Sequence, residues 1–159
     1  MRNWAIEPEI KDLVNFLKKM GCNIEWVNKR SVKIEGVSKV EEITYPVMFD
    51  RIEAGTYLVA AALTEGNLKI KNIVPKIIQT EINTLKKIGA KIKIKKNEIH
   101  ILGNKKIKNM NVITAPYPGF PTDLQAQMMV LLCKAKKQSI IKEDIFENRF
   151  MHVAELNRM

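Results

Sequence analysis

Apolar residues recur at intervals of three and four in three segments of the chain. The segments are EPEIKDLVNFLKKMG (7–21), PKIIQTEINTLKKIG (75–89) and FENRFMHVAELNRM (146–159). This spacing puts the apolar side chains on one face of a helix, so each segment is predicted to be an amphipathic helix. The matching apolar positions in the three segments are Val14, Leu17 and Met20, then Ile82, Leu85 and Ile88, then Val153, Leu156 and Met159. The three helices are therefore interpreted as copies of one element.

The segments that follow the first two helices also match each other. Gly21 is followed by CNIEW and SVKIEG, and Gly89 is followed by AKIKI and EIHILG. Glycine at a helix C-terminus permits the positive φ that ends many helices, and two short alternating runs are typical of a β-hairpin. A helix followed by a hairpin is thus predicted twice.

Two further segments share a capped apolar helix that leads into a short strand. They are FDRIEAGTYLVAAALTEGNLKIKNI (49–73) and TDLQAQMMVLLCKAKKQSIIKEDI (122–145). The predicted repeat unit is strand, helix, strand, helix, strand, strand, and it is complete once, from about Val47 to Leu102. Repeated supersecondary units bury one another's apolar faces, so the fold class is predicted to be α/β, built from such units.

The repeat is incomplete at both ends of the chain. The sequence opens on the second helix of a unit and stops at Met159, one residue before the position where both earlier copies have glycine. Terminal repeats usually carry polar caps, and neither end resembles one. We expect a segment of a longer repeat protein, truncated at both ends.

Composition narrows the class of protein further. The 159 residues are 46% hydrophobic and 28% charged, which is typical of a globular domain, and no apolar run is long enough for a membrane span. The N-terminus lacks the pattern of a signal peptide. Cys22 and Cys133 lack metal-ligand spacing, so reduced thiols and a cytoplasmic location are expected. Neither a metal site nor a cofactor motif such as a glycine-rich dinucleotide loop is found.

A net charge of +10 raises the alternative of a nucleic-acid-binding protein. The 27 Lys and Arg residues are mostly lysines spread along the chain, and in KIKIKK (91–96) they alternate with isoleucine as on a solvated strand face. Aromatic residues make up 6% and do not interleave with this run, so no stacking surface for bases is visible. Nucleic acid is therefore not the expected partner, and the charge is interpreted as a composition bias.

Two aspartates occupy matching positions before helices. Asp50 and Glu53 form the D-x-x-E pattern of a capping box. Asp123 stands at the equivalent place in PYPGFPTDLQAQ (116–127), where the second copy has gained a proline-rich loop. Prolines stiffen the loop and lower the entropy lost when a ligand is held against it. The residues alone favour Asp123 as a helix cap, and a catalytic role stays open.

Four other side chains are candidates for chemistry. Arg149 in IFENRFMH is interpreted either as an anion site at a helix start or as the partner of a nearby carboxylate. His152 is expected to make a local hydrogen bond, and His100 to be structural. Cys133 lies in the apolar run MMVLLCKA and is expected to pack as a small, inert hydrophobic residue.

Three strings together carry a family resemblance. DRIEAGTYLVAAAL, APYPGFPTDLQAQ and IFENRFMHVAELNRM, in this order and spacing, resemble the UDP-N-acetylglucosamine 1-carboxyvinyltransferase family of enolpyruvyl transferases. The resemblance runs from about Trp4 to Met159. It implies two domains of strand-helix units around a pseudo-threefold axis, an inside-out α/β barrel or α-β prism. Residues 1–45 would be the tail of the first domain and residues 46–159 the larger, N-terminal part of the second.

The resemblance also implies a reaction and two site residues. The family transfers the enolpyruvyl group of phosphoenolpyruvate to the 3-hydroxyl of UDP-N-acetylglucosamine, the first committed step of peptidoglycan synthesis. Asp123 matches the family's general base, which contacts the sugar hydroxyl, and Ile145 matches a position whose backbone contacts the UDP-sugar. No role follows for Glu147, and Arg149 is a candidate for anion contact only.

The family's N-terminal Lys-Asn pair, its mobile loop with the reactive cysteine and its C-terminal phosphate-binding arginine match no part of this chain. We therefore expect the chain alone to be inactive, and the rest of the same enzyme to be its partner. The alternatives are a non-catalytic interaction module that uses unpaired repeat edges and, with less support, a basic nucleic-acid-binding protein.

Overall fold

The structure, a computed structural model, describes residues 1–159 and divides into two compact units, Met1–Met48 and Phe49–Met159. Each unit has its own hydrophobic core. The division falls next to the predicted domain crossover at residues 45 and 46, and the assignment of the two units to domains of a larger enzyme stays a prediction. No helix in the structure combines the length and the apolar character needed to cross a membrane.

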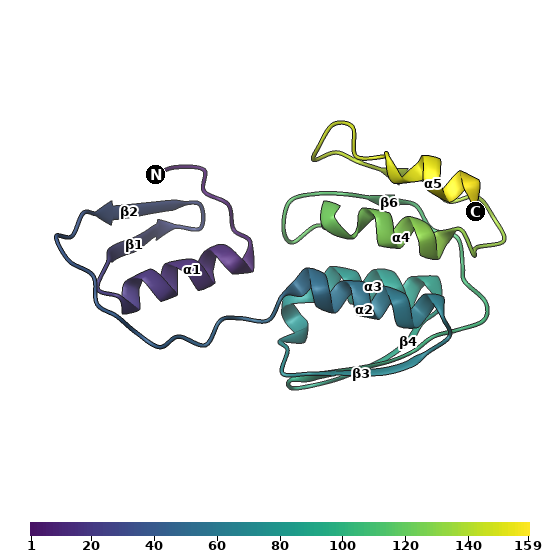
Figure 1. Cartoon of the computed structure of the whole chain (residues 1–159), viewed down its shortest axis with the longest axis horizontal. Helices are drawn as coiled ribbons and strands as arrows, with labels where there is room; N and C mark the ends of the chain where they lie inside the picture. The colour runs from purple at the N-terminus through teal and green to yellow at the C-terminus, as the bar shows by residue number, and fades with distance from the viewer. The chain divides into compact units, whose positions relative to one another are not determined.

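The first unit is one helix packed on one hairpin (Figure 1). Helix α1 (Pro8–Lys19) is followed by strands β1 (Asn23–Asn28) and β2 (Ser31–Glu35), which pair antiparallel. Three buried side chains form its core, with Trp4 and Trp26 packed against them: Val14, Ile24 and Val32. The predicted helix and hairpin are both confirmed here.

A carboxylate of α1 fixes the chain segment that leaves the first unit. Asp12 accepts a hydrogen bond from the Tyr45 hydroxyl at 2.8 Å and one from the backbone N–H of Met48 at 3.3 Å. The hydrogen bond to Asp12, burial and the charge of Asp12 together raise the pKa of Tyr45. These hydrogen bonds hold the last segment of the first unit in place, although this segment forms neither a helix nor a strand.

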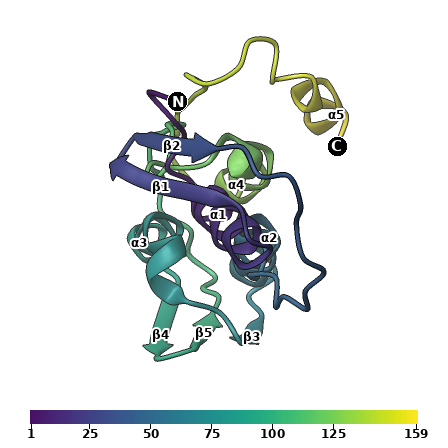
Figure 2. The same cartoon turned by 90° about the vertical axis from the view of Figure 1, so that its left-hand side faces the viewer.

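The second unit begins with a layer of helices on an antiparallel sheet. Helices α2 (Arg51–Leu63) and α3 (Gln79–Ile88) lie side by side on one face of the sheet, as Figures 1 and 2 show. The sheet has the order β3-β5-β4, and its strands are β3 (Asn67–Lys71), β4 (Lys91–Lys95) and β5 (Glu98–Leu102). A 3-10 turn, η1 (Pro75–Ile78), precedes α3, and Gly89 ends α3 at φ 120° as predicted.

The remaining elements form a parallel strand-helix-strand crossover on the side of α2 that faces away from the antiparallel sheet. Strand β6 (Val112–Ile113) leads through the 3-10 turn η2 (Thr122–Leu124) into α4 (Gln125–Leu132) and then β7 (Ile141–Lys142). β6 and β7 pair in parallel, and α4 packs against α2 (Figure 2). The chain closes with α5 (His152–Arg158), which buries no residue. The buried core of this unit is shared by α2, α3, α4 and the sheet.

One predicted element is absent and another is wrong in its bounds. The repeat unit was expected to open with a strand near Val47, but residues 41–50 form neither a helix nor a strand. The third amphipathic helix was expected from Phe146, but it begins at His152 after a series of turns in which Asn148 takes a positive φ of 56°. Because a right-handed helix excludes a residue at positive φ, Asn148 interrupts the expected helix in its first turn.

Candidate active site

The ends of β6 and β7 place polar residues side by side. Thr114 follows β6 directly and is fully buried, and Glu143 follows β7 directly. In parallel sheets the carboxyl ends of neighbouring strands share one edge, where the N-terminus of the crossover helix also lies. Residues Thr122 and Asp123 of η2 start that crossover. The fold therefore brings three separate segments together at one edge.

Asp123 does not cap the helix that follows it. The residue with the extended conformation of an N-cap is Pro121, at φ −71° and ψ 137°, which has no side-chain acceptor. Asp123 lies within the first turn, and its carboxylate accepts a hydrogen bond from Arg149 at 2.8 Å. In contrast Asp50 caps α2, accepting from the N–H groups of Ile52 and Glu53. The interpretation of Asp123 as a helix cap is therefore wrong, and that of Asp50 is confirmed.

Arg149 lies in the turns before α5 and reaches back to η2. Its Nη1 atom donates to Asp123 Oδ1 at 2.8 Å and to Thr122 Oγ1 at 2.9 Å. Its guanidinium group also lies over the ring of Phe146, 5.1 Å from the ring centroid. Of the two interpretations of Arg149, the partner of a nearby carboxylate is confirmed. The Asp123 side chain stays 52% exposed and that of Arg149 38% exposed, so both remain accessible to a ligand.

Glu143 is the centre of a hydrogen-bond network that the sequence did not reveal. Its Oε1 atom accepts from the Thr114 hydroxyl at 2.9 Å and from the N–H groups of Ile145 and Phe146, while Oε2 accepts from the Thr122 hydroxyl at 2.8 Å. Burial by itself would raise the pKa of Glu143, but the hydrogen bonds from Thr122, Ile145, Thr114 and Phe146 outweigh it, so the pKa is lowered. A carboxylate directly after a short parallel strand was the one signal available in the sequence.

Ile145, the second residue expected at the site, lies in this network through its backbone. Its N–H donates to Glu143 Oε1 at 2.9 Å. Ile145 follows β7, and Asp123 begins the crossover helix, so both belong to the same edge of the parallel pair. Contact of either residue with a substrate stays a prediction.

The proline-rich loop is anchored to α3 and α2. The Thr80 hydroxyl of α3 donates to the backbone carbonyl of Pro118 at 2.6 Å. The guanidinium group of Arg51, at the start of α2, lies 5.7 Å from the ring centroid of Tyr117. Arg51 is itself buried near Glu81, whose pKa burial raises and the Arg51 charge partly lowers. The loop that leads into Asp123 is therefore held in place by contacts with α2 and α3.

A hollow of ≈ 230 Å³ lies beside the charged pair. Its lining comprises Thr122, Asp123, Gln125, Ala126, Arg149 and His152. Two buried nitrogen atoms in this lining, Nε2 of Gln125 and Nε2 of His152, have no hydrogen-bond partner. The expectation that His152 makes a local hydrogen bond is therefore not met at Nε2. Buried polar groups are normally paired, so two unpaired ones in one hollow point to a site that accepts a polar molecule.

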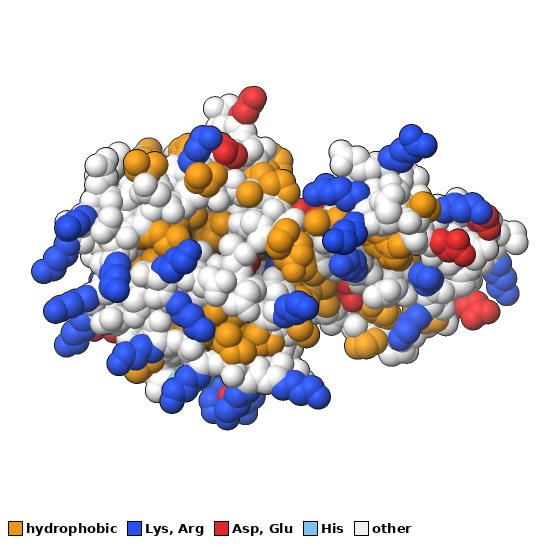
Figure 3. All heavy atoms as spheres, turned by 180° about the vertical axis from the view of Figure 1, so that it is seen from behind, with side chains coloured by type: hydrophobic (Ala, Val, Ile, Leu, Met, Phe, Trp, Pro, Cys, Tyr) orange, Lys and Arg blue, Asp and Glu red, His pale blue; other side chains and the backbone are white.

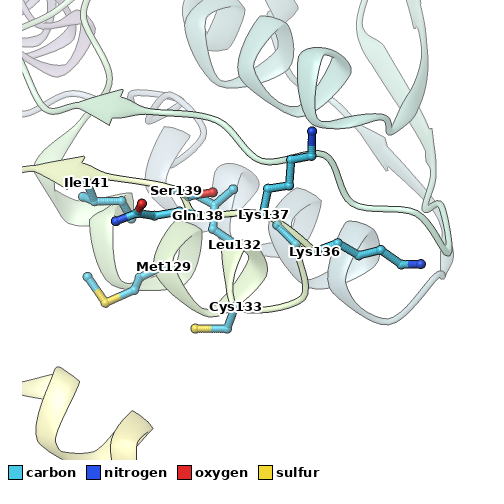
Figure 4. A pocket seen from close by; sticks show the side chains of 9 residues that line it. Met129, Leu132, Cys133, Lys136, Lys137, Gln138, Ser139 and Ile141 are labelled. Atoms are coloured by element: carbon cyan, nitrogen blue, oxygen red, sulfur yellow. The ribbon is translucent and has the colours of Figure 1, made fainter.

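A second hollow, of ≈ 480 Å³, lies at the C-terminal end of α4. Figure 4 shows the sulfur atoms of Met129 and Cys133 pointing to the same side, while Lys136 and Lys137 extend away from the thiol. Cys133 is the C-terminal cap residue of α4 and is exposed, so the expectation that it packs as a hydrophobic residue is wrong. No group of three or more His, Cys, Asp or Glu residues in the chain is placed to hold a metal ion. His100 lies in β5 and hydrogen-bonds Asn67 of β3, which is the structural role expected of it.

The positive charge is dispersed over the surface that Figure 3 shows. Lys and Arg side chains dot this face, with hydrophobic side chains between them. The alternating lysines of β4 are exposed, as expected of a solvated strand face. This distribution contrasts with the basic stripe typical of nucleic-acid-binding domains.

The fold is that of a mixed α/β protein with a polar site at the carboxyl ends of its parallel strands. The solved structure of the enolpyruvyl transferase NikO from Streptomyces tendae matches 98% of this chain with a TM-score of 0.84 at 22% sequence identity, and the match covers 38% of the NikO chain. The model of the family described as EPSP synthase (3-phosphoshikimate 1-carboxyvinyltransferase) matches residues 1–159. The chain belongs to this family.

Two curated relatives bear the name of the family that the sequence strings resemble. UDP-N-acetylglucosamine 1-carboxyvinyltransferase of Pelagibacter ubique is 76% identical over all 159 residues, and UDP-N-acetylglucosamine 1-carboxyvinyltransferase 1 of Caldanaerobacter subterraneus subsp. tengcongensis is 48% identical. The chain spans 38% of the length of each. The resemblance inferred from the three sequence strings is therefore confirmed.

Proposed function

We propose that this chain is part of a cytoplasmic enzyme that transfers the enolpyruvyl group of phosphoenolpyruvate to the 3-hydroxyl of UDP-N-acetylglucosamine. This is the first committed step of peptidoglycan synthesis. The proposal is supported by the identity to relatives of that name and by one feature of the site: the Asp123 carboxylate is half exposed and paired with Arg149 instead of capping its helix. The two-domain α-β prism expected for the whole enzyme is part of the same proposal.

In the proposed mechanism Asp123 is the general base. Its carboxylate takes the proton of the sugar 3-hydroxyl as the hydroxyl oxygen bonds to C2 of phosphoenolpyruvate, and an acid group in the rest of the enzyme donates a proton to C3. In the second step that group takes a proton back from C3, the C2–O bond to phosphate breaks, and the double bond is restored. A base must lie within hydrogen-bond reach of the proton it removes, and Asp123 retains a second oxygen atom besides the one that accepts from Arg149.

The neighbours of Asp123 suit charged and polar substrates. Arg149 brings a guanidinium group to the same hollow, where it can bind an anionic group of either substrate. The unpaired nitrogen atoms of Gln125 and His152 can bond to substrate oxygens or hydroxyls there. The backbone of Ile145, on the adjacent segment, is the proposed contact to the UDP-sugar.

We also propose that the 159-residue chain does not catalyse the reaction by itself. It spans 38% of its curated relatives, and most of the rate of such a reaction depends on groups that position both substrates. The remaining part of the enzyme is then the partner that the chain requires.

The test is a graft of residues 1–159 into the Pelagibacter ubique enzyme in place of the matching segment. Phosphate release from phosphoenolpyruvate with UDP-N-acetylglucosamine is expected from the graft and not from the chain alone. In the graft, Asp123→Asn is expected to lower kcat by roughly 10²–10⁴-fold, the usual contribution of a general base. Asp144→Asn changes the same charge at an exposed site and is the control. An Asp123→Asn graft that turns over normally would refute the role of Asp123.

A further inference from the structure

We propose that Glu143 is a positioning residue that fixes the Asp123–Arg149 pair through the Thr122 hydroxyl. The inference rests on the proposed function, because it names a group that holds the proposed base without touching the reacting atoms. It is carried by the geometry of one carboxylate whose two oxygen atoms bond to three separate segments of the chain.

The first role of Glu143 is to join the two parallel strands to the crossover. Its Oε1 atom accepts from Thr114, the residue after β6, and its Oε2 atom accepts from Thr122, the first residue of η2. Thr114 in turn accepts at its Oγ1 from the backbone N–H of Asp144 at 2.9 Å. The carboxylate thus ties the ends of β6 and β7 and the start of the crossover helix to one point.

The second role is to shape the turn that carries Arg149. Oε1 also accepts from the N–H groups of Ile145 and Phe146, at 2.9 and 3.2 Å. These bonds fix the turn that follows β7, and α5 begins only at His152. Arg149 lies in the turns between these two points, from which it reaches both Thr122 and Asp123.

The third role of Glu143 is to set the direction of the hydrogen bonds around Thr122. An ionised carboxylate only accepts, so the single hydroxyl proton of Thr122 must point at Glu143. The lone pairs of Thr122 Oγ1 are then free to accept from Arg149 Nη1 at 2.9 Å. The same Nη1 donates to Asp123, so Arg149 is held at two points. The hydrogen bonds thus run in one direction, from Arg149 through Thr122 to Glu143, and they orient the guanidinium group toward Asp123.

Glu143→Gln removes this order while keeping the shape of the side chain. With the amide nitrogen at the Oε2 position, it would donate to Thr122 Oγ1 and compete with Arg149 for the lone pairs. With the amide nitrogen at the Oε1 position, it would face the N–H groups of Ile145 and Phe146. The first orientation loses the bond that Thr122 donates, and the second loses the bonds from both N–H groups. Thr122→Val removes the hydroxyl that joins Arg149 to Glu143, and Thr122→Ser keeps it.

The experiment has two arms, of which the first uses the 159-residue chain. Side-chain 15N spectra report the hydrogen exchange of the Arg149 guanidinium group, with the signal assigned by Arg149→Lys. Glu143→Gln and Thr122→Val are both expected to speed this exchange several-fold. Thr122→Ser is expected to restore the wild-type rate, and Asp144→Asn, which alters an exposed carboxylate paired with Lys142, to leave it unchanged.

The second arm uses the graft in the Pelagibacter ubique enzyme. Glu143→Gln and Thr122→Val are expected to lower kcat about 10-fold with KM for both substrates nearly unchanged, because small displacements of a catalytic group are costly in rate. Thr122→Ser restores kcat. If the wild-type graft is inactive, the proposed function fails and the exchange of Arg149 alone decides on Glu143. Arg149 exchange that neither Glu143→Gln nor Thr122→Val changes would overturn the inference. If Glu143→Gln does not fold, Thr122→Val gives the same readout.

Discussion

Asp123 and Arg149 are joined by a hydrogen bond of 2.8 Å between Oδ1 and Nη1, and neither takes part in capping a helix. The two residues come from opposite ends of the crossover, one at its start and the other beyond β7. Their side chains stay 52% and 38% exposed, so the pair contributes little to stability, since exposed ion pairs are typically worth about 0–1 kcal/mol. The site is therefore arranged for access more than for stability.

The contrast between Asp50 and Asp123 gives a first test. Asp50→Ala removes an acceptor of two backbone N–H groups at the start of α2 and is expected to lower the free energy of unfolding of the second unit by about 1 kcal/mol. Asp123→Asn removes only the exposed pair and is expected to cost less than about 0.5 kcal/mol. Urea unfolding followed by far-UV circular dichroism measures both. Equal losses in the two variants would contradict the difference in role.

The sequence pattern predicted those elements of the fold that depend on the local spacing of apolar residues. α1, α3 and the two hairpins follow from apolar periodicity and from the glycines at the helix ends, and Gly89 takes the expected positive φ. The strand expected near Val47 is absent, and the helix expected from Phe146 begins only at His152. In the second case the hydrogen bonds of Arg149 to Thr122 and Asp123, 27 and 26 residues away, hold the segment in turns, and no local signal reports them.

The candidate site was predictable only in part for the same reason. Asp123 was singled out by its loop and by resemblance, but its match to Asp50 suggested the wrong structural role. The N-cap conformation had moved to Pro121, a shift that the aligned strings do not reveal. The side-chain partners of Glu143 are Thr114 and Thr122, which lie 29 and 21 residues away, so the local sequence does not reveal its importance.

Gly55 lets α2 approach the turn that holds Asp123. A Cβ atom at Gly55 would lie 2.4 Å from Cδ1 of Leu124, a fully buried residue adjacent to Asp123. Gly55→Ala is expected to destabilise the second unit by about 1–3 kcal/mol of overpacking, offset in part by up to about 1 kcal/mol of helix propensity. Gly36→Ala is the control, because nothing lies within 4 Å of its added Cβ. A Gly55→Ala chain as stable as the control variant would show that Leu124 repacks without cost.

The two units are expected to unfold separately, and the tryptophans make this measurable. Both tryptophans, Trp4 and Trp26, pack on the small core of the first unit, so tryptophan fluorescence reports that unit alone. Val14→Ala is expected to cost about 1–3 kcal/mol and to shift the fluorescence transition. Leu58→Ala, in the core of the second unit, is expected to cost about 2–5 kcal/mol and to shift only the circular dichroism transition. A fluorescence shift in Leu58→Ala would contradict independent unfolding.

Acidification is expected to remove the contribution of Glu143 to stability. Its pKa in the folded chain lies below the ordinary value of 4.5, so the folded state favours the ionised carboxylate. Its stabilisation is then present above the unfolded pKa and is lost as pH falls through the folded pKa. The pKa of Glu81 is shifted in the opposite direction, so the folded state takes up that proton at a higher pH than the unfolded chain and gains stability as pH falls. The two effects overlap in the wild-type curve, and only a difference between variants separates them.

The measurement is the difference in unfolding free energy between the wild-type chain and Glu143→Gln from pH 7 down to pH 3. The difference is expected to be largest near neutral pH, where the carboxylate accepts all four hydrogen bonds, and to shrink below about pH 4.5 as the wild-type group takes up a proton. Asp144→Asn changes the same charge one residue away, on a side chain that pairs only with exposed Lys142, and serves as the matched control. Since its pair is exposed, its difference from wild type is expected to stay small throughout. A Glu143→Gln difference that grows on acidification would mean that the carboxylate is not held ionised by its four donors, and the network around Thr122 would then have to be assigned differently.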